Sequence, residues 1–166
     1  MKNTLTTHML ITNLDQAYNR QSWHGTNLRG SLRGLTPAIA ARRPRPGRHN
    51  IWEIVVHCAY WKYAVWRRIT GTKRGSFPEK GSNWFRRPAD ASARAWRADL
   101  ALLERMHRQL RETIASIPVR NLNRKGKGSR HTNAFMITGI AAHDLYHAGQ
   151  IQLLKALLAA HAKELA

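Results

Sequence analysis

Apolar residues recur every three or four positions in four long stretches of the chain, a period typical of helices with one buried face. Runs in which apolar β-branched residues alternate with polar ones, which would indicate strands, are missing. We therefore expect an all-α protein, and four long helices, the first of them broken, favour a four-helix bundle. The stretches lie at about 6–20, 50–70, 90–117 and 132–158.

Local signals mark where these helices begin and end. Asn50 and Glu53 have the spacing of a capping box, with asparagine in the place of serine, at the start of the second helix. Gly71 is expected to end that helix. A shorter helical piece is expected at 28–35, stopped by Gly34 and Pro37. The connection that follows Gly71 has about 18 residues, so it is either mobile or functional.

The composition suits one domain spanning residues 1–166, and its charge is unusual. Lys and Arg number 28 against 9 Asp and Glu, which gives a net charge of +19. Such a field favours polyanions, but an arginine-rich genome composition is the preferred explanation, because the charges form no single stripe in the sequence. One cysteine, Cys58, excludes an internal disulfide framework. Without a signal peptide or an apolar span, we expect a cytoplasmic protein with no membrane partner.

Three histidines form the main candidate site. His143 and His147 lie one helical turn apart on the last helix, and His57 shares a face of the second helix with apolar residues. Buried imidazoles need partners, and a divalent metal is one that neutral imidazole nitrogens bind well. Spacing alone leaves hydrogen-bonded core or surface histidines as the alternative. Cys58 adjoins His57 and therefore points about 100° away on a helix, which makes it a poor further ligand.

Other residues are weaker candidates. Asp144 is a candidate catalytic or ligand-orienting carboxylate, with a surface position as the alternative. Gln150 is expected at the site mouth or in a structural hydrogen bond, Trp61 and Trp84 in the pocket wall or the core, and His24 at the substrate or in a turn. The remaining histidines are interpreted as structural or solvated: His8, His49, His107, His131 and His161.

Three runs of sequence together resemble the DinB-like superfamily of four-helix-bundle proteins, and the resemblance covers nearly the whole chain. They are WHG at 23–25, RPRPGRHNIWEIVVHCAYW at 43–61 and HDLYHAGQI at 143–151. The resemblance implies an up-down-down-up bundle with a long crossover at 71–89, and often a homodimer. It also implies zinc or nickel bound by His57, His143 and His147. In that topology the basic loops around Arg45 and Lys125 lie at opposite ends, so one continuous nucleic-acid groove is not expected.

Two functions follow from these observations. The first is a metal-dependent enzyme on small molecules in detoxification or stress response, for which the resemblance implies a thiol-dependent S-transferase, with a low-molecular-weight thiol as cosubstrate, or a hydrolase. Thiol transfer is preferred to hydrolysis because no general base besides Asp144 lies near the histidines in sequence. The second is a polyanion-binding protein, nonspecific for nucleic acid, in which the metal is structural.

Overall fold

Helices make up the regular structure of the chain over residues 2–88 and 90–164, which the computed structural model describes. The expectation of an all-α fold is therefore confirmed. Side chains are described for residues 5–88 and 90–160, so His161 lies outside them. The elements are α1 (Lys2–Tyr18), α2 (Leu28–Ser31), α3 (Pro37–Ala41), α4 (Ile51–Thr70), α5 (Ala93–Ser116), the 3₁₀ helix η1 (Val119–Asn121) and α6 (Asn133–Glu164).

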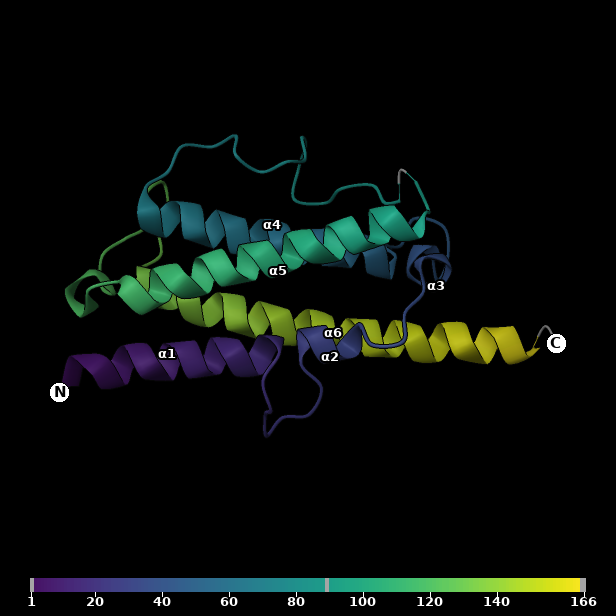
Figure 1. The fold of residues 1–166 in the computed structure, drawn as a ribbon, viewed down its shortest axis with the longest axis horizontal. Coiled ribbons are helices and arrows are strands. Elements are labelled where there is room, and N and C mark those ends of the chain that lie inside the picture. The colour runs from purple at the N-terminus through teal and green to yellow at the C-terminus, as the bar shows by residue number, and fades with distance from the viewer. Residues whose placement is uncertain (1, 89, 165–166) are drawn as a thin grey trace.

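The four long helices lie side by side along the length of the molecule (Figure 1). α4 packs against α5 and α6, and α1 packs against the same two helices. Trp52 contacts Trp96 near the start of α4 and of α5, so these two helices are parallel. Lys62 of α4 pairs with Asp144 of α6, and the two helices run in opposite directions. In Figure 1, α1 and α6 run one way along the molecule while α4 and α5 run the other way.

The connection from α4 to α5 returns along the whole length of α4 before α5 begins (Figure 1). It is anchored by two buried phenylalanines, Phe77 and Phe85, whose rings contact each other at 5.4 Å. Both rings also contact Tyr60 of α4, at 5.4 and 5.6 Å. The connection therefore forms part of the hydrophobic core and covers the outer side of α4.

The start of α4 is held by one buried asparagine. Asn50 Oδ1 accepts the Glu53 backbone N–H at 2.8 Å, which is the expected N-cap bond. Its Nδ2 donates to the carbonyl oxygens of Ala41 and Arg87, at 3.2 and 2.7 Å. The Glu53 carboxylate bonds with the side chain of Arg43. Asn50 thus joins α3, α4 and the end of the long connection. The expected stop of α4 is also present, since Gly71 is its left-handed C-cap with φ 75°.

The single short helix expected at 28–35 is wrong. α2 ends at Ser31, and a separate helix, α3, begins at Pro37. Proline suits the first position of a helix because its missing N–H would have no helical partner there. Thr36 caps α3, with its Oγ1 accepting the Ile39 N–H at 3.2 Å. Pro37 therefore starts a helix in place of stopping one.

Charge is unevenly distributed over this fold. All lysines and arginines except Lys2, Lys155 and Lys163 lie between residues 20 and 130. α1 and α6 consequently carry few charges, and exposed apolar side chains occur on both, among them Leu5, Met9, Tyr146, Leu153 and Leu157. Among the described residues, no helix combines the length and the apolarity that a membrane span requires.

Candidate metal centre

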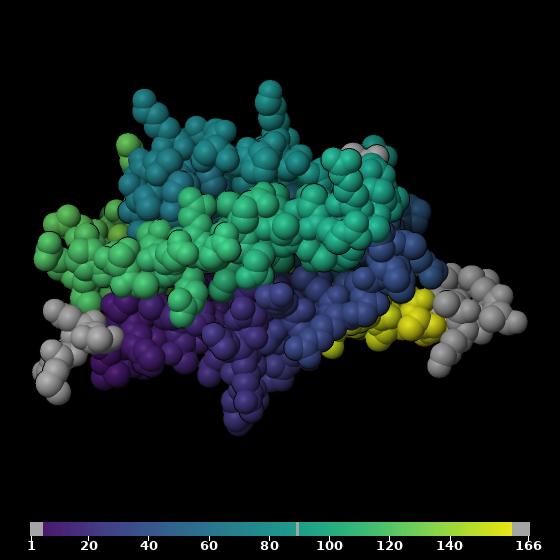
Figure 2. All heavy atoms as spheres, in the orientation of Figure 1, coloured from purple at the N-terminus to yellow at the C-terminus, as the bar shows by residue number. Residues whose placement is uncertain are grey.

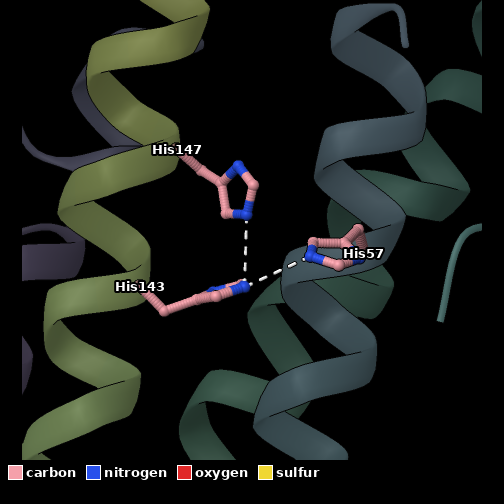
Figure 3. Close-up of side chains that lie close together, drawn as sticks. All are labelled: His57, His143 and His147. Carbon is pink, nitrogen blue, oxygen red and sulfur yellow. Dashed lines mark hydrogen bonds between the residues drawn. The ribbon is translucent and has the colours of Figure 1, made fainter.

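Three imidazoles from two antiparallel helices converge between α4 and α6 (Figure 3). The Nε2 atom of His143 lies 3.2 Å from Nε2 of His57 and 3.2 Å from Nε2 of His147. His57 and His147 are 4% and 3% exposed, and His143 is half-buried. The helical spacing of His143 and His147 brings both rings to the same side of α6, where α4 presents His57. The structure thus brings together the three histidines expected from the sequence.

The outer ring nitrogens of two of these histidines determine their tautomers. Nδ1 of His57 lies 2.8 Å from the carbonyl oxygen of Asn83, which can only accept, so this nitrogen carries the proton. Nδ1 of His147 donates in the same way to Oε1 of Gln150 at 2.7 Å, and Gln150 Nε2 donates to the Tyr146 hydroxyl at 3.0 Å. The Nε2 atoms of His57 and His147 are therefore unprotonated and carry lone pairs that point inward.

This donor set fits a divalent cation. A proton on His143 Nε2 can be donated well to only one of the two facing lone pairs, so one close nitrogen pair remains without a hydrogen. A cation at the convergence point would satisfy all three nitrogens, and neutral imidazole is a preferred ligand of zinc and nickel. The ligand nitrogens all lie within 4.8 Å of one another. The arrangement supports a divalent metal site formed by His57, His143 and His147.

The electrostatics of the site keep the imidazoles neutral. Burial lowers the pKa of His57 to about 4, and the nearby His147 and His49 lower it further against the opposing bond to Asn83. Burial, followed by the charges of His147 and His57, lowers the pKa of His143 to about 3. The pKa of His147 is also lowered by burial. At neutral pH all three rings are therefore unprotonated and able to bind a cation.

Asp144 lies behind the histidines and is not a surface residue. It is fully buried and forms an ion pair with Lys62 of α4, which is fully buried as well. Its second oxygen, Oδ1, and the Nδ1 of His143 are buried with no hydrogen-bond partner among the described residues. Burial raises the pKa of Asp144 to about 6, and Lys62 opposes this rise. The surface interpretation of Asp144 is thus wrong, and the carboxylate is committed to an internal ion pair.

Aromatic rings surround the imidazoles. Trp84, at the end of the long connection, stacks on His57 at 3.7 Å and on His49 at 3.7 Å, so its indole lies between the two histidines. Trp61 lies edge-on to His57 with ring centroids 6.3 Å apart. The exposed Tyr146 contacts His147 at 5.0 Å. Among the described residues, Trp61, Trp84 and Tyr146 are the other aromatic rings that contact the cluster.

His24, in contrast, is an exposed residue in the loop between α1 and α2, and it is not among the described rings around the cluster. Sequence reasoning also missed contributors to the site, namely Lys62, Asn83, Tyr146 and the stacking role of His49. Only Tyr146 had a usable signal, because it lies between the two histidines of one helix, four residues before Gln150. The others depend on the path of the chain between helices.

A family model described as the DinB superfamily matches residues 20–151, which include all three histidines and most of the chain. This chain belongs to the DinB superfamily. The resemblance drawn from the sequence runs is therefore confirmed. No curated protein and no solved structure significantly matches the chain. Membership in the DinB superfamily accordingly places the chain in a family without assigning a reaction to it.

Proposed function

We propose that this DinB-superfamily chain is a metal-dependent enzyme that acts on small molecules in detoxification or stress response. The observation that carries the proposal is the convergence of three neutral imidazoles, in which Nε2 of His143 lies 3.2 Å from Nε2 of His57 and 3.2 Å from Nε2 of His147. His57, His143 and His147 would hold zinc or nickel, and they would contribute no charge to it. When bound, the ion would supply Lewis acidity and would stabilise the thiolate form of a low-molecular-weight thiol cosubstrate.

Thiol transfer is supported over hydrolysis by the state of the nearest carboxylate. A hydrolase needs a group that accepts a proton from the attacking nucleophile. Asp144 is fully buried and paired with Lys62, so it is poorly placed to exchange protons with a substrate. The aromatic rings of Trp61, Trp84 and Tyr146 provide apolar surface for the substrate beside the imidazoles, and Gln150 orients the His147 ring.

The metal site is tested by elemental analysis of protein purified without an affinity tag. We expect about one divalent ion per chain, lost in His57→Ala, His143→Ala and His147→Ala. His131→Ala is the matched control, because His131 is exposed and stacks on Phe135 at 4.5 Å, away from the cluster. Full occupancy that persists in His147→Ala would contradict the three-histidine site.

The thiol step is tested by replacing the metal with cobalt(II) and titrating glutathione, bacillithiol or mycothiol. Thiolate binding should produce a near-ultraviolet charge-transfer band and release about one proton per thiol, since the thiolate is the ligand. His143→Ala should show neither signal. A metal-loaded protein that shows no band with any of these thiols, yet hydrolyses an ester or amide, would reject thiol transfer in favour of hydrolysis.

We further propose that two copies associate through α1 and α6. Leu5 and Met9 of α1 and Leu153 and Leu157 of α6 are 52–63% exposed, and both helices carry few charges. Elsewhere two copies of a chain with net charge +19 would repel each other. Light scattering should show a dimer that Leu153→Glu converts to monomer. Wild-type protein that stays monomeric at high concentration would contradict this contact.

A further inference from the structure

The outward face of α5 carries a row of four exposed arginines, which Glu112 follows one turn after the last of them. Arg94, Arg97, Arg105 and Arg108 are spaced by three, eight and three residues, which places them on one side of a helix. All four are exposed, and none forms a hydrogen bond or salt bridge among the described residues. At 1.5 Å per residue, the row from Arg94 to Arg108 is about 21 Å long.

The scarcity of acidic residues explains why this row stays unpaired. Most of the described carboxylates are paired with other basic residues, whereas Glu112 is exposed on α5 four residues after Arg108 and forms no salt bridge among the described residues. Asp15 pairs with Arg111, Glu53 with Arg43, and Glu104 with Arg29, while Glu79 and Asp99 both pair with Arg87. Asp90, near the start of α5, accepts hydrogen bonds from Ser92, which lower its pKa, and the charge of Arg94 lowers it further. The guanidinium groups of Arg97, Arg105 and Arg108 are therefore available to bind an anionic ligand.

The row connects the two basic loops that the sequence placed at opposite ends of the bundle. One loop, at 42–48, carries Arg42, Arg45 and Arg48 and leads into α4, whose Trp52 contacts Trp96 at the start of α5. The other, at 120–130, follows the end of α5 directly. In Figure 2, α5 crosses the face turned to the reader between the segment after it and the segment that precedes α4. The arginine row of α5 thus runs between the two loops and forms a basic track with them, which Glu112 interrupts between Arg108 and the loop at 120–130.

We propose that this track binds the phosphate backbone of duplex nucleic acid without reading its bases. Guanidinium groups form paired hydrogen bonds with phosphate, and a row of them matches an extended polyanion better than a single small anion. A membrane surface is disfavoured, because none of the large exposed apolar side chains of the described residues lies on α5. Backbone contacts alone carry no sequence preference, so affinity should depend on salt and not on base sequence.

The test compares two variants with equal net charge. The α5 variant replaces Arg94, Arg97, Arg105 and Arg108 with Gln, which keeps helix propensity. The control variant replaces four exposed basic residues outside the track, which are Arg20, Arg33, Lys73 and Arg74, with Gln. Binding of each protein to a short mixed-sequence DNA duplex is measured by fluorescence anisotropy over a series of salt concentrations.

For the α5 variant, the slope of log affinity against log salt should become shallower by about 3 to 4, with at least about a hundredfold loss at low salt. The control variant should stay within about fivefold of wild type. Equal losses in the two variants would mean that net charge alone attracts DNA and would overturn the track. Vesicles of phosphatidylcholine and phosphatidylserine that displace the duplex from the wild type but not from the α5 variant would assign the track to lipid and likewise overturn the proposal. Binding should persist in His143→Ala, since the track is independent of the metal site.

Discussion

At the scale of single residues, the centre of the bundle contains charge that a hydrophobic core would not need. Lys62 and Asp144 are both fully buried, and they pair across the interface between α4 and α6. The free energy needed to remove two charges from water often exceeds the attraction between them in the interior. We therefore do not expect this pair to increase the net stability of the fold. The pair ties α4 to α6 one residue from His143, which places it where it can maintain the spacing of the ligand histidines.

Breaking this pair should cost more than replacing it. Lys62→Met leaves the Asp144 carboxylate buried without its cation, and we expect a loss of about 3–5 kcal/mol in the free energy of unfolding. The double variant Lys62→Met/Asp144→Leu should recover most of that loss, because no unpaired charge remains. Urea denaturation of the metal-free proteins measures both values. Equal stability of the single variant and the wild type would show that the pair is not buried as described.

His107 should make the fold sensitive to acid. Burial, then the positive charges of Lys62, Arg111 and Arg29, lowers its pKa to about 2, far below the ordinary value near 6.5. Below about pH 6.5 the unfolded chain therefore binds a proton that the folded chain excludes, so stability falls as pH falls. His107→Phe keeps a ring against Tyr18, on which His107 stacks at 3.7 Å.

As the pH is lowered from 6 to 4, the free energy of unfolding should fall less steeply in the His107→Phe protein than in the wild type. The difference between the two slopes should reach up to about 1.4 kcal/mol per pH unit. Urea denaturation at a series of pH values, on protein freed of metal, gives both slopes. The three site histidines titrate in both proteins and cancel in the comparison. A slope identical to that of wild type would mean that His107 becomes protonated in the folded state.

At the scale of elements, the sequence predicted what the apolar period and the caps encode. The four long helices, the Asn50 cap and the Gly71 stop could be read because each depends on residues close in the chain. The convergence of His57 with His143 and His147 required only that two apolar faces meet. Trp84 could be named as a candidate for the pocket wall, but its stacking on His57 and the role of the Asn83 carbonyl could not be predicted, because both depend on how the long connection returns over α4.

Asn50 is the residue by which these elements are joined most directly. Asn50→Ala removes the N-cap of α4 and leaves the carbonyls of Ala41 and Arg87 without their donor, so we expect a loss of about 2–3 kcal/mol. Asn50→Ser keeps an acceptor for the Glu53 N–H and should lose less. Thermal and urea unfolding of the two variants would rank them. An Asn50→Ser protein that is as unstable as Asn50→Ala would show that the carbonyl bonds dominate over the cap.

At the scale of the whole molecule, the charge separates the fold into two kinds of surface. The basic residues gather on the segments between residues 20 and 130, while α1 and α6 remain nearly neutral. Positive charges held close together in the folded chain repel one another more than in the expanded unfolded chain. This repulsion acts through solvent, so dissolved salt screens it.

Added salt should therefore stabilise the protein. The free energy of unfolding, measured with uncharged urea as denaturant, should rise as sodium chloride is raised from about 0.01 to 0.15 M, over which the screening length shortens from about 30 to 8 Å. The α5 variant, with four fewer positive charges, should show a smaller rise. Stability that does not change with salt in either protein would mean that the folded chain is no more strained by its charge than the unfolded one.

The hydrogen bond from His57 to the carbonyl of Asn83 also affects how well the metal site tolerates substitutions around it. Its acceptor is a main-chain carbonyl, which every amino acid supplies, so Asn83→Ala should retain metal affinity. His147 depends on the side chain of Gln150, and Gln150→Leu should weaken metal binding about tenfold or more in a competition with a chelator. Equal effects of the two changes would contradict this difference. A substitution at position 83 should therefore leave the His57 hydrogen bond in place, whereas a substitution at position 150 can remove the acceptor of His147.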